Sequence, residues 1–189
     1  MPRTRRLTLL LLALLAAPAW AATYRLDPGH TTPQFALDHL WFFTERGRFT
    51  RVEGSLEYDA GQASGRLEVV IDARSLDTDN EERDAVLKGP DWFDVERYPS
   101  IVFRSQRFLF EQGRLAAIEG SLTMLGVAQP MRLEIARIQC GSTPASAKQT
   151  CSADAHGTLR RSRFGMHSGL PFIGDEVRLR IQARTFPQD

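Results

Sequence analysis

Apolar and polar residues alternate with a period of two along most of the chain beyond its first 21 residues. In the run GRLEVVIDA, Leu67, Val69 and Ile71 share one face, and charged side chains occupy much of the other. The final run DEVRLRIQARTF, residues 175–186, alternates in the same way. Because successive side chains of a strand point to opposite faces, this pattern predicts antiparallel sheet with one dry face and one hydrated face.

Turn-forming segments rich in glycine, aspartate and proline separate the alternating runs and predict about eight strands. The expected strands lie near residues 23–28, 47–58, 65–74, 100–110, 114–124, 130–139, 152–162 and 175–186. No internal repeat or linker divides the chain. The pattern is typical of a single all-β domain, either a closed barrel or a sandwich.

Helix is expected in only two places. Residues 78–90 carry acidic side chains at the start and a Gly-Pro pair at the end, with Thr78 or Asp79 as the N-cap of a capping box. Its apolar stripe is narrow, so this helix should lie on a surface rather than inside a core. A second short helix is expected within residues 31–44, where a strand is the alternative.

The first 21 residues have the features of an export signal. Three arginines precede an uncharged apolar run, and Ala19-Trp20-Ala21 supplies small residues where a signal peptidase cleaves. The apolar run is shorter than the ~20 residues that span a bilayer comfortably, although an uncleaved anchor is the alternative. We expect residues 1–21 to be a signal peptide, residues 22–189 to be the mature domain, and the periplasm to be its location.

The charge of the mature chain gives no support for a nucleic-acid ligand. Without the three arginines of the signal, 21 basic residues face 23 acidic residues, a net charge of −2 with histidine neutral. A phosphate-rich partner requires a basic surface instead.

Cys140 and Cys151 are the only two cysteines. One cysteine pair in an exported chain favours a disulfide, and the polar segment GSTPASAKQT between them is typical of a hairpin loop. A redox-active pair would have the closer spacing of Cys-x-x-Cys. A metal site that adds His156 is the remaining alternative. We expect a disulfide that contributes up to about 3 kcal/mol in the chain-entropy model.

Five segments, in the same order, resemble the YceI-like family of exported, lipocalin-like polyisoprenoid-binding proteins. They are YRLDPGHTTPQFALDHL, GRFTRVEGSLEYD, VVIDARSLDTDNEERDAVLKGPDWFDVERYPSIVFRS, GSLTMLGVAQPMRLEI, and RRSRFGM with GDEVRLRI. The third is the most specific, and together they cover essentially all of residues 23–186. Family members often carry two phenylalanines where this chain has Trp92-Phe93, and a longer side chain or histidine where it has Leu125. The loop between the two cysteines is not regarded as general in the family.

The resemblance implies an all-β fold, an extended eight-stranded antiparallel lipocalin-like β-barrel with one or two short helices. Its lumen would take a long isoprenoid chain, such as that of a quinone or quinone precursor. The charged helix and the Trp92-Phe93 loop would wall one end of the barrel, with Arg83 and Asp84 fixing the helix. Alternation alone does not decide between a hollow lumen and an ordinary packed core.

The expected ligand contacts come from the inward strand faces and from the segments near the barrel ends. They are Phe35, Leu37, His39, Leu40, Val69, Ile71, Arg83, Asp84, Leu87, Trp92, Phe93, Phe103, Leu122, Leu133, Ile135, Phe164, Leu179 and Ile181. His30 and His39 are expected to meet near one barrel end, as framework or head-group contacts, with a metal or haem ligand as the alternative. Arg161, Ser162 and Phe164 are expected to be structural, with a head-group contact as the alternative. No resident metal or cofactor is expected apart from a bound isoprenoid lipid or quinone.

The predicted function is that of a periplasmic carrier for a long-chain polyisoprenoid lipid, not an enzyme. The sequence contains no Gly-x-Ser-x-Gly, His-Glu-x-x-His or nucleotide-binding loop. The alternatives are an exported electron-transfer accessory protein that contacts quinone or haem, and a small hydrolase or isomerase. A transient contact with a membrane or a membrane redox protein, and a homodimer, are compatible with the sequence.

Overall fold

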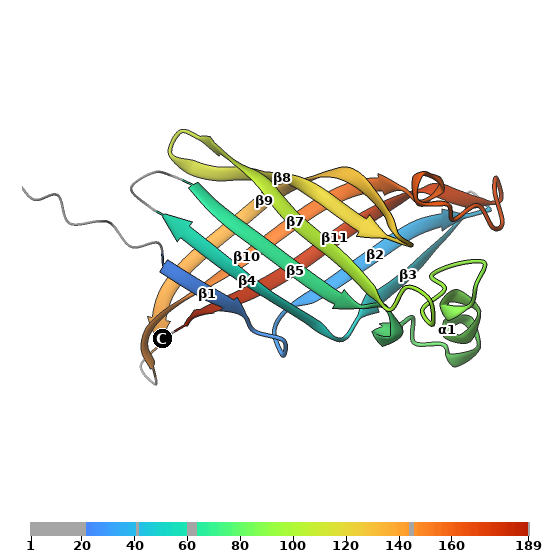
Figure 1. Cartoon of the computed structure of the whole chain (residues 1–189), viewed down its shortest axis with the longest axis horizontal. Coiled ribbons are helices and arrows are strands. Elements are labelled where there is room, and N and C mark those ends of the chain that lie inside the picture. Colours follow the sequence, from blue (N-terminus) through green and yellow to red (C-terminus); the bar gives the residue numbers. More distant parts are fainter. Residues whose placement is uncertain (1–21, 41, 60–63, 144–145, 189) are drawn as a thin grey trace, which may run out of the picture.

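The computed structural model describes residues 22–40, 42–59, 64–143 and 146–188, which form a β-barrel with a helical insert at one end (Figure 1). The strands are β1 (Ala22–Leu26), β2 (Thr32–His39), β3 (Phe43–Phe49), β4 (Val52–Asp59), β5 (Ser64–Asp72), β6 (Leu76–Asp77), β7 (Ser100–Glu111), β8 (Arg114–Met124), β9 (Val127–Thr143), β10 (Ser146–Arg160) and β11 (Ile173–Pro187). The helices are α1 (Glu81–Lys88) and two short 3-10 helices, η1 (Ala73–Ser75) and η2 (Arg161–Phe164). Within the described ranges, no helix is long and apolar enough to cross a bilayer.

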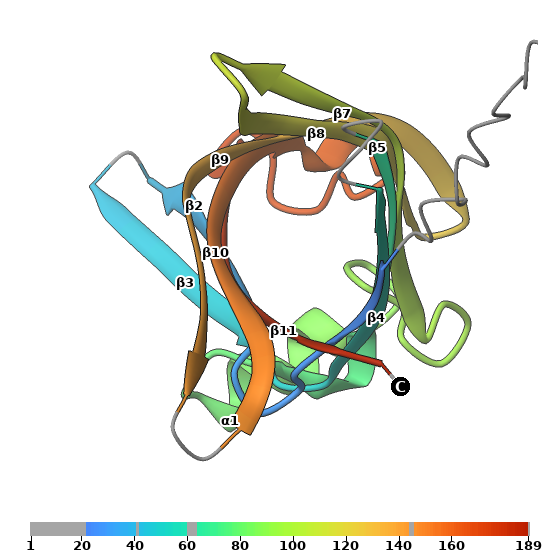
Figure 2. The same cartoon turned by 90° about the vertical axis from the view of Figure 1, so that its left-hand side faces the viewer.

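The sheet closes on itself as an eight-stranded antiparallel barrel, as the family resemblance implies. Around the barrel the order is β1-β4-β5-β7-β8-β9-β10-β11, and β1 also pairs with β11, with Leu26 opposite Thr185. β2 continues the line of β1 along β11, and β3 continues the line of β4 along β2. Each of these two pairs therefore occupies one strand position, and Figure 2 shows the positions arranged around one axis.

The break between β3 and β4 corrects the prediction of one continuous strand over residues 47–58. The backbone N–H groups of Thr50 and Arg51 donate to the carbonyl and hydroxyl oxygens of Ser75, at 3.1 and 3.0 Å, instead of to a neighbouring strand. Ser75 belongs to η1, so these bonds bend the chain. β4 continues beside β5, whereas β3 pairs with β2 and, through two residues, with β6.

The prediction of a helix within residues 31–44 is wrong. Most of these residues form β2 and the start of β3, and β2 is paired with β11 on one edge and with β3 on the other. Pro33, Phe35 and Leu37 alternate with exterior positions and line the barrel interior. The alternating pattern prevails here because a strand finds backbone partners on both of its edges.

Helix α1 is present and ends before Gly89, as predicted, but its N-cap differs from the prediction. Asn80 is the N-cap, because its side-chain oxygen accepts the backbone N–H of Arg83 at 2.9 Å. Thr78 is buried, and its hydroxyl donates to the Asp84 carboxylate at 2.6 Å. That bond ties Thr78 to the side of the helix and leaves the capping position to Asn80.

We call residues 78–99 the insert; they lie at the end of the barrel that also holds the β2–β3 turn (Figure 1). Helix α1 itself contributes no buried side chain, so it needs polar anchors. Arg83 supplies them: Nη1 pairs with Glu45 of β3, Nε donates to the Thr78 hydroxyl at 2.9 Å, and Nη2 donates to the Thr78 carbonyl at 2.8 Å. Arg83 and Asp84 therefore fix the helix in place, the structural role predicted for them.

The predicted disulfide between Cys140 and Cys151 is confirmed. The two residues lie directly opposite each other in β9 and β10, with their Cα atoms 4.1 Å apart. The bridge therefore joins neighbouring strands near their hairpin connection.

Large side chains inside the barrel lie across glycines of neighbouring strands. A Cβ atom added to Gly120 of β8 would lie 2.2 Å from the Arg104 carbonyl oxygen and 2.8 Å from the Phe103 ring. A Cβ at Gly47 of β3 would lie 2.4 Å from the Phe35 ring. These glycines let aromatic rings lie flat against the wall, so the rings take less of the barrel interior.

Replacing Gly120 with alanine should destabilise the barrel, because the new Cβ meets backbone atoms that cannot move independently. We expect a loss of about 1–3 kcal/mol in the free energy of unfolding, the usual range for overpacking. The control is Gly141→Ala on β9, where a Cβ would have no neighbour within 4 Å. Urea unfolding measures both, and equal stability of the two variants would contradict the packing described for Gly120.

Replacing Arg83 with methionine should loosen the insert while the barrel persists, because it removes the contacts to Glu45 and Thr78 together. Backbone amides of residues 81–98 should exchange with deuterium faster than in the unaltered protein, whereas those of β8 and β9 should keep their rates. Arg114→Met is a matched control at an exposed position of β8. Unchanged exchange in the insert would show that Arg83 does not anchor it.

Candidate binding cavity in the barrel

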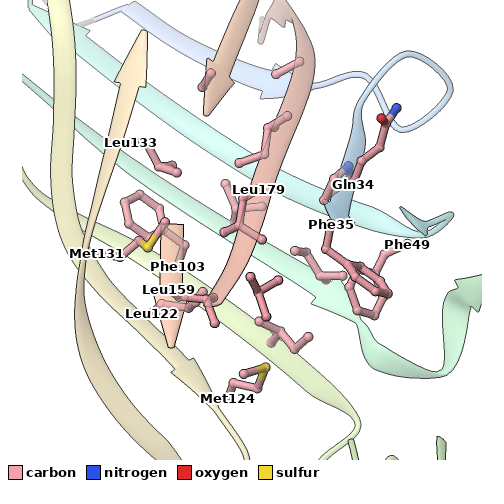
Figure 3. Close-up of a pocket in the computed structure, with 18 of the residues that line it drawn as sticks. Gln34, Phe35, Phe49, Phe103, Leu122, Met124, Met131, Leu133, Leu159 and Leu179 are labelled. Carbon is pink, nitrogen blue, oxygen red and sulfur yellow. The ribbon is translucent and has the colours of Figure 1, made fainter. Parts of the chain in front are cut away.

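An apolar cavity of about 200 Å³ lies inside the barrel. Figure 3 shows side chains from opposite walls, among them Phe103, Leu133 and Leu179, directed into a common space. The lining is made of leucine, isoleucine, valine, phenylalanine, methionine and other apolar residues, apart from Thr31, Gln34 and Arg161. This arrangement follows from the period-two alternation, which directs every second side chain of each strand inward.

The cavity is narrow for its length. The wall runs along β11 from Val177 to Ala183, a distance of roughly 20 Å at the rise of a strand. Its volume is nevertheless below the ~300–1,000 Å³ of common small-molecule sites. A slender, flexible apolar chain suits that shape better than a compact ring system does.

Most of the residues predicted to contact a ligand line this cavity. They are Phe35, Leu37, Val69, Ile71, Leu87, Trp92, Phe93, Phe103, Leu122, Leu133, Ile135, Leu179 and Ile181. Their position in the cavity wall is therefore established, and their contact with a ligand stays a prediction.

Five predicted contacts lie elsewhere. His39 and Leu40 are at the β2–β3 turn, and the Leu40 N–H donates to the Phe172 carbonyl at 2.7 Å. Arg83 and Asp84 are used in anchoring α1, as described above. Phe164 is buried in the core on η2, with 3% of its surface exposed, but it borders a small outer groove instead of the cavity.

The expectation that His30 and His39 meet is wrong. His30 precedes β2 and His39 ends it, so the length of that strand separates them, roughly 25 Å. His30 is bound locally instead, with Nδ1 at 2.7 Å from the Asp27 carboxylate. Among the described residues, no group of three or more His, Cys, Asp or Glu side chains is placed to hold a metal ion.

The insert forms the wall of the cavity where β3 and β4 separate. Leu87, Trp92 and Phe93 line the cavity from outside the barrel strands. The Phe93 ring packs edge-on against Phe49 of β3, with centroids 5.6 Å apart, and lies 6.3 Å from Phe35 of β2. This aromatic cluster joins the insert to the strands that leave the barrel wall beyond the β3–β4 break.

Several lining residues were absent from the predicted contact set. Some, such as Leu67, Met131 and Val177, belong to apolar faces that the sequence already identified. Others, such as Met124 and Met166, lie next to turns, where alternation carries no information about direction. Arg161 has the signal of the Arg-Ser-x-Phe-Gly motif but not the pattern of a lumen residue, because a charge is not expected on a dry face.

Arg161 is anchored at the insert end of the cavity. Only 1% of its surface is exposed, and its guanidinium lies over the Trp92 ring, 5.0 Å from the ring centroid. Burial lowers the pKa of the Arg161 guanidinium, and the nearby Asp175 carboxylate acts in the opposite direction. Arg161 and Trp92 together close this end of the apolar space.

Comparison with known proteins gives the family. A model of the YceI-like domain matches residues 24–185. Protein YceI of Escherichia coli O157:H7 is 30% identical over 185 residues, 96% of each chain. A UPF0312 protein of Pseudomonas aeruginosa is 30% identical over 176 residues, 92% of this chain and 91% of the relative.

Solved structures share the fold. BcnA of Burkholderia cenocepacia matches with a TM-score of 0.71 at 22% identity, over 84% of this chain and 98% of BcnA. A polyisoprenoid-binding domain from Saccharophagus degradans, implicated in plant cell wall breakdown, matches with a TM-score of 0.65 at 14% identity, over 88% and 99% of the two chains. With the family model spanning nearly the whole described barrel, the chain belongs to the YceI-like family.

Proposed function

We propose that this protein is an exported carrier that holds the chain of a polyisoprenoid lipid, such as a quinone or a quinone precursor, inside its barrel. The observation that carries the proposal is the narrow apolar cavity, walled on all sides by strands and at one end by the insert. The name of the Saccharophagus degradans domain supports the same ligand class. Residues 1–21, with their basic start and apolar run, support export to the periplasm.

The energetics favour a carrier that recognises the chain. Each buried CH₂ group contributes about 0.8 kcal/mol at best, so an isoprene unit contributes a few kcal/mol before ordering costs are subtracted. Several units in the lumen would dominate the affinity. A ligand so insoluble in water needs an apolar binding cavity of this kind to cross an aqueous compartment.

The protein should carry its ligand when it is purified from its own host without detergent. Mass spectrometry of an organic extract is expected to find an isoprenoid lipid in stoichiometric amount. An absorption spectrum of the same sample identifies a quinone by its ultraviolet band and a haem by its Soret band. An extract with no isoprenoid lipid, from a sample that also fails to bind added isoprenoid, would contradict the carrier function.

Two neighbouring valines of β5 provide a matched test of the lumen. Val69 lines the cavity, whereas Val70 faces the outer surface, where it borders two grooves. Val69→Asp should abolish retention of the lipid, because a carboxylate in the lumen must lose its hydration when the chain enters. Val70→Asp should retain it.

Thermal unfolding of both variants accompanies the binding measurement. A folded Val69→Asp protein that binds an isoprenoid as well as Val70→Asp does would show that the ligand lies outside the lumen. If Val69→Asp does not fold, Val69→Thr with Val70→Thr as its control repeats the comparison at nearly constant volume.

A further inference from the structure

Arg161 is the only charged side chain among the buried residues of the described chain. It also lines the cavity, whose other lining is almost entirely apolar. A cation in such surroundings is costly unless its environment compensates the charge. The kind of compensation that this residue receives therefore indicates which ligand the site favours.

All the hydrogen bonds of the Arg161 side chain go to neutral backbone oxygens. Nε donates to the Gly174 carbonyl at 2.8 Å, Nη1 to the Met166 carbonyl at 3.0 Å, and Nη2 to the Ile173 carbonyl at 2.8 Å. These carbonyls hold the segment between η2 and β11 around the guanidinium. They solvate the charge with dipoles but leave the net positive charge in place.

No carboxylate of the described residues forms an ion pair with Arg161. The nearest candidate, Asp175, is used by Ser162, whose N–H and hydroxyl donate to its two oxygens at 2.8 and 2.9 Å. Charged residues on the outer wall behave differently: Arg132, for example, pairs with Glu119 at 2.9 Å and with Glu134 at 2.5 Å. Arg161 is thus a buried positive charge without a bonded anionic partner, and the Asp175 carboxylate offsets only part of the cost of its burial.

The guanidinium also keeps unused donors. It has five N–H bonds, of which the three carbonyls take one from each nitrogen. One N–H on Nη1 and one on Nη2 have no acceptor among the described residues. The Trp92 ring covers one face of the planar guanidinium. Further contacts to the guanidinium are therefore expected along its edge, where the N–H bonds point.

We propose that the Arg161 end of the cavity receives the head group of the lipid, and that this head group is an oxygen acceptor or an anion. A carbonyl, a carboxylate or a phosphate would accept the two free N–H bonds, and an anion would also neutralise the charge. An ammonium head group is disfavoured, since repulsion between like charges is strong in a low-dielectric space. The chain then extends along β11 toward Ala183. This inference rests on the proposed carrier function.

Three ligands with one C15 chain test the charge preference: farnesoic acid, farnesol and farnesylamine. At pH 7.5 they present an anion, a neutral hydroxyl and a cation on the same isoprenoid. Calorimetric titration of the lipid-free protein should give an affinity for the acid at least about tenfold above that for the amine, with the alcohol between them.

Two single-residue variants locate the preference. Arg161→Met should remove it, whereas Arg160→Met, which changes the exposed neighbour at the end of β10, should leave it unchanged. If Arg161→Met does not fold, carbon-13 NMR of carboxyl-labelled farnesoic acid on the unaltered protein replaces it. The pKa of the bound carboxyl should then fall below that of the free acid, whereas burial away from a cation would raise it.

The outcomes separate the two proposals. If none of the three ligands binds, the carrier function is wrong and the inference falls with it. If all three bind with equal affinity, or the pKa of the bound carboxyl rises, the carrier function stands and the role of Arg161 is overturned. A preference for the acid that persists in Arg161→Met would place the head group elsewhere.

Discussion

The barrel closes through a short ladder in which β1 pairs with β11, and the interior exists only because of that closure. A closed sheet pairs its backbone hydrogen-bonding groups around the ring, so the ring has no exposed edge strand. The circumference is then set by the eight strand positions, not by the side chains that fill it. With glycines such as Gly120 and Gly47 beneath the aromatic rings, the inward side chains leave a narrow apolar space. The backbone pairing of the wall therefore does not depend on a ligand, as the proposed carrier function requires.

The insert covers the part of the barrel wall where strand pairing is incomplete. Beyond the break at Thr50 and Arg51, β3 leaves β4 and finds only the two-residue β6 on its outer edge. The wall there would be open, and the aromatic side chains Trp92 and Phe93 cover it instead. Helix α1 is the support for that cover, which explains why it has no buried residue of its own. The charged helix and the aromatic loop therefore form one structural unit: the helix is anchored by polar contacts, and the loop covers the cavity with apolar side chains.

Alternation predicted the inside of the barrel well, because the side chains of every second residue along a strand point to the same face. Val69, Ile71, Leu179 and Ile181 follow from that rule alone, and they line the cavity as a result. The same rule held in β2, where a short helix was predicted with a strand as the alternative. Sequence reasoning failed where the chain turns: the N-cap of α1, the separation of His30 and His39, and the positions of Leu40 and Phe164 all depend on tertiary contacts. Arg161 could not be placed inside from its pattern, since only the carbonyls of residues far along the chain make a buried guanidinium tolerable there.

The distribution of charge distinguishes the two faces of the wall. Outside, arginines and carboxylates lie next to one another. In the network of Arg107, Glu119, Arg132 and Glu134 on β7, β8 and β9, each charge meets an opposite one. Contact with these arginines lowers the pKa of Glu119, so the network stays ionised at neutral pH. Inside, the single charge of Arg161 contacts dipoles and an aromatic ring, and the Asp175 carboxylate lies nearby without bonding to it. A carboxylate bonded directly to Arg161 would serve a purely structural role. The nearby Asp175 carboxylate instead accepts its hydrogen bonds from Ser162. Because this positive charge has no bonded anion and lies at one end of an otherwise apolar tube, the two ends of the lumen are chemically different. An amphiphile with an oxygen-rich head therefore has one favourable orientation in it.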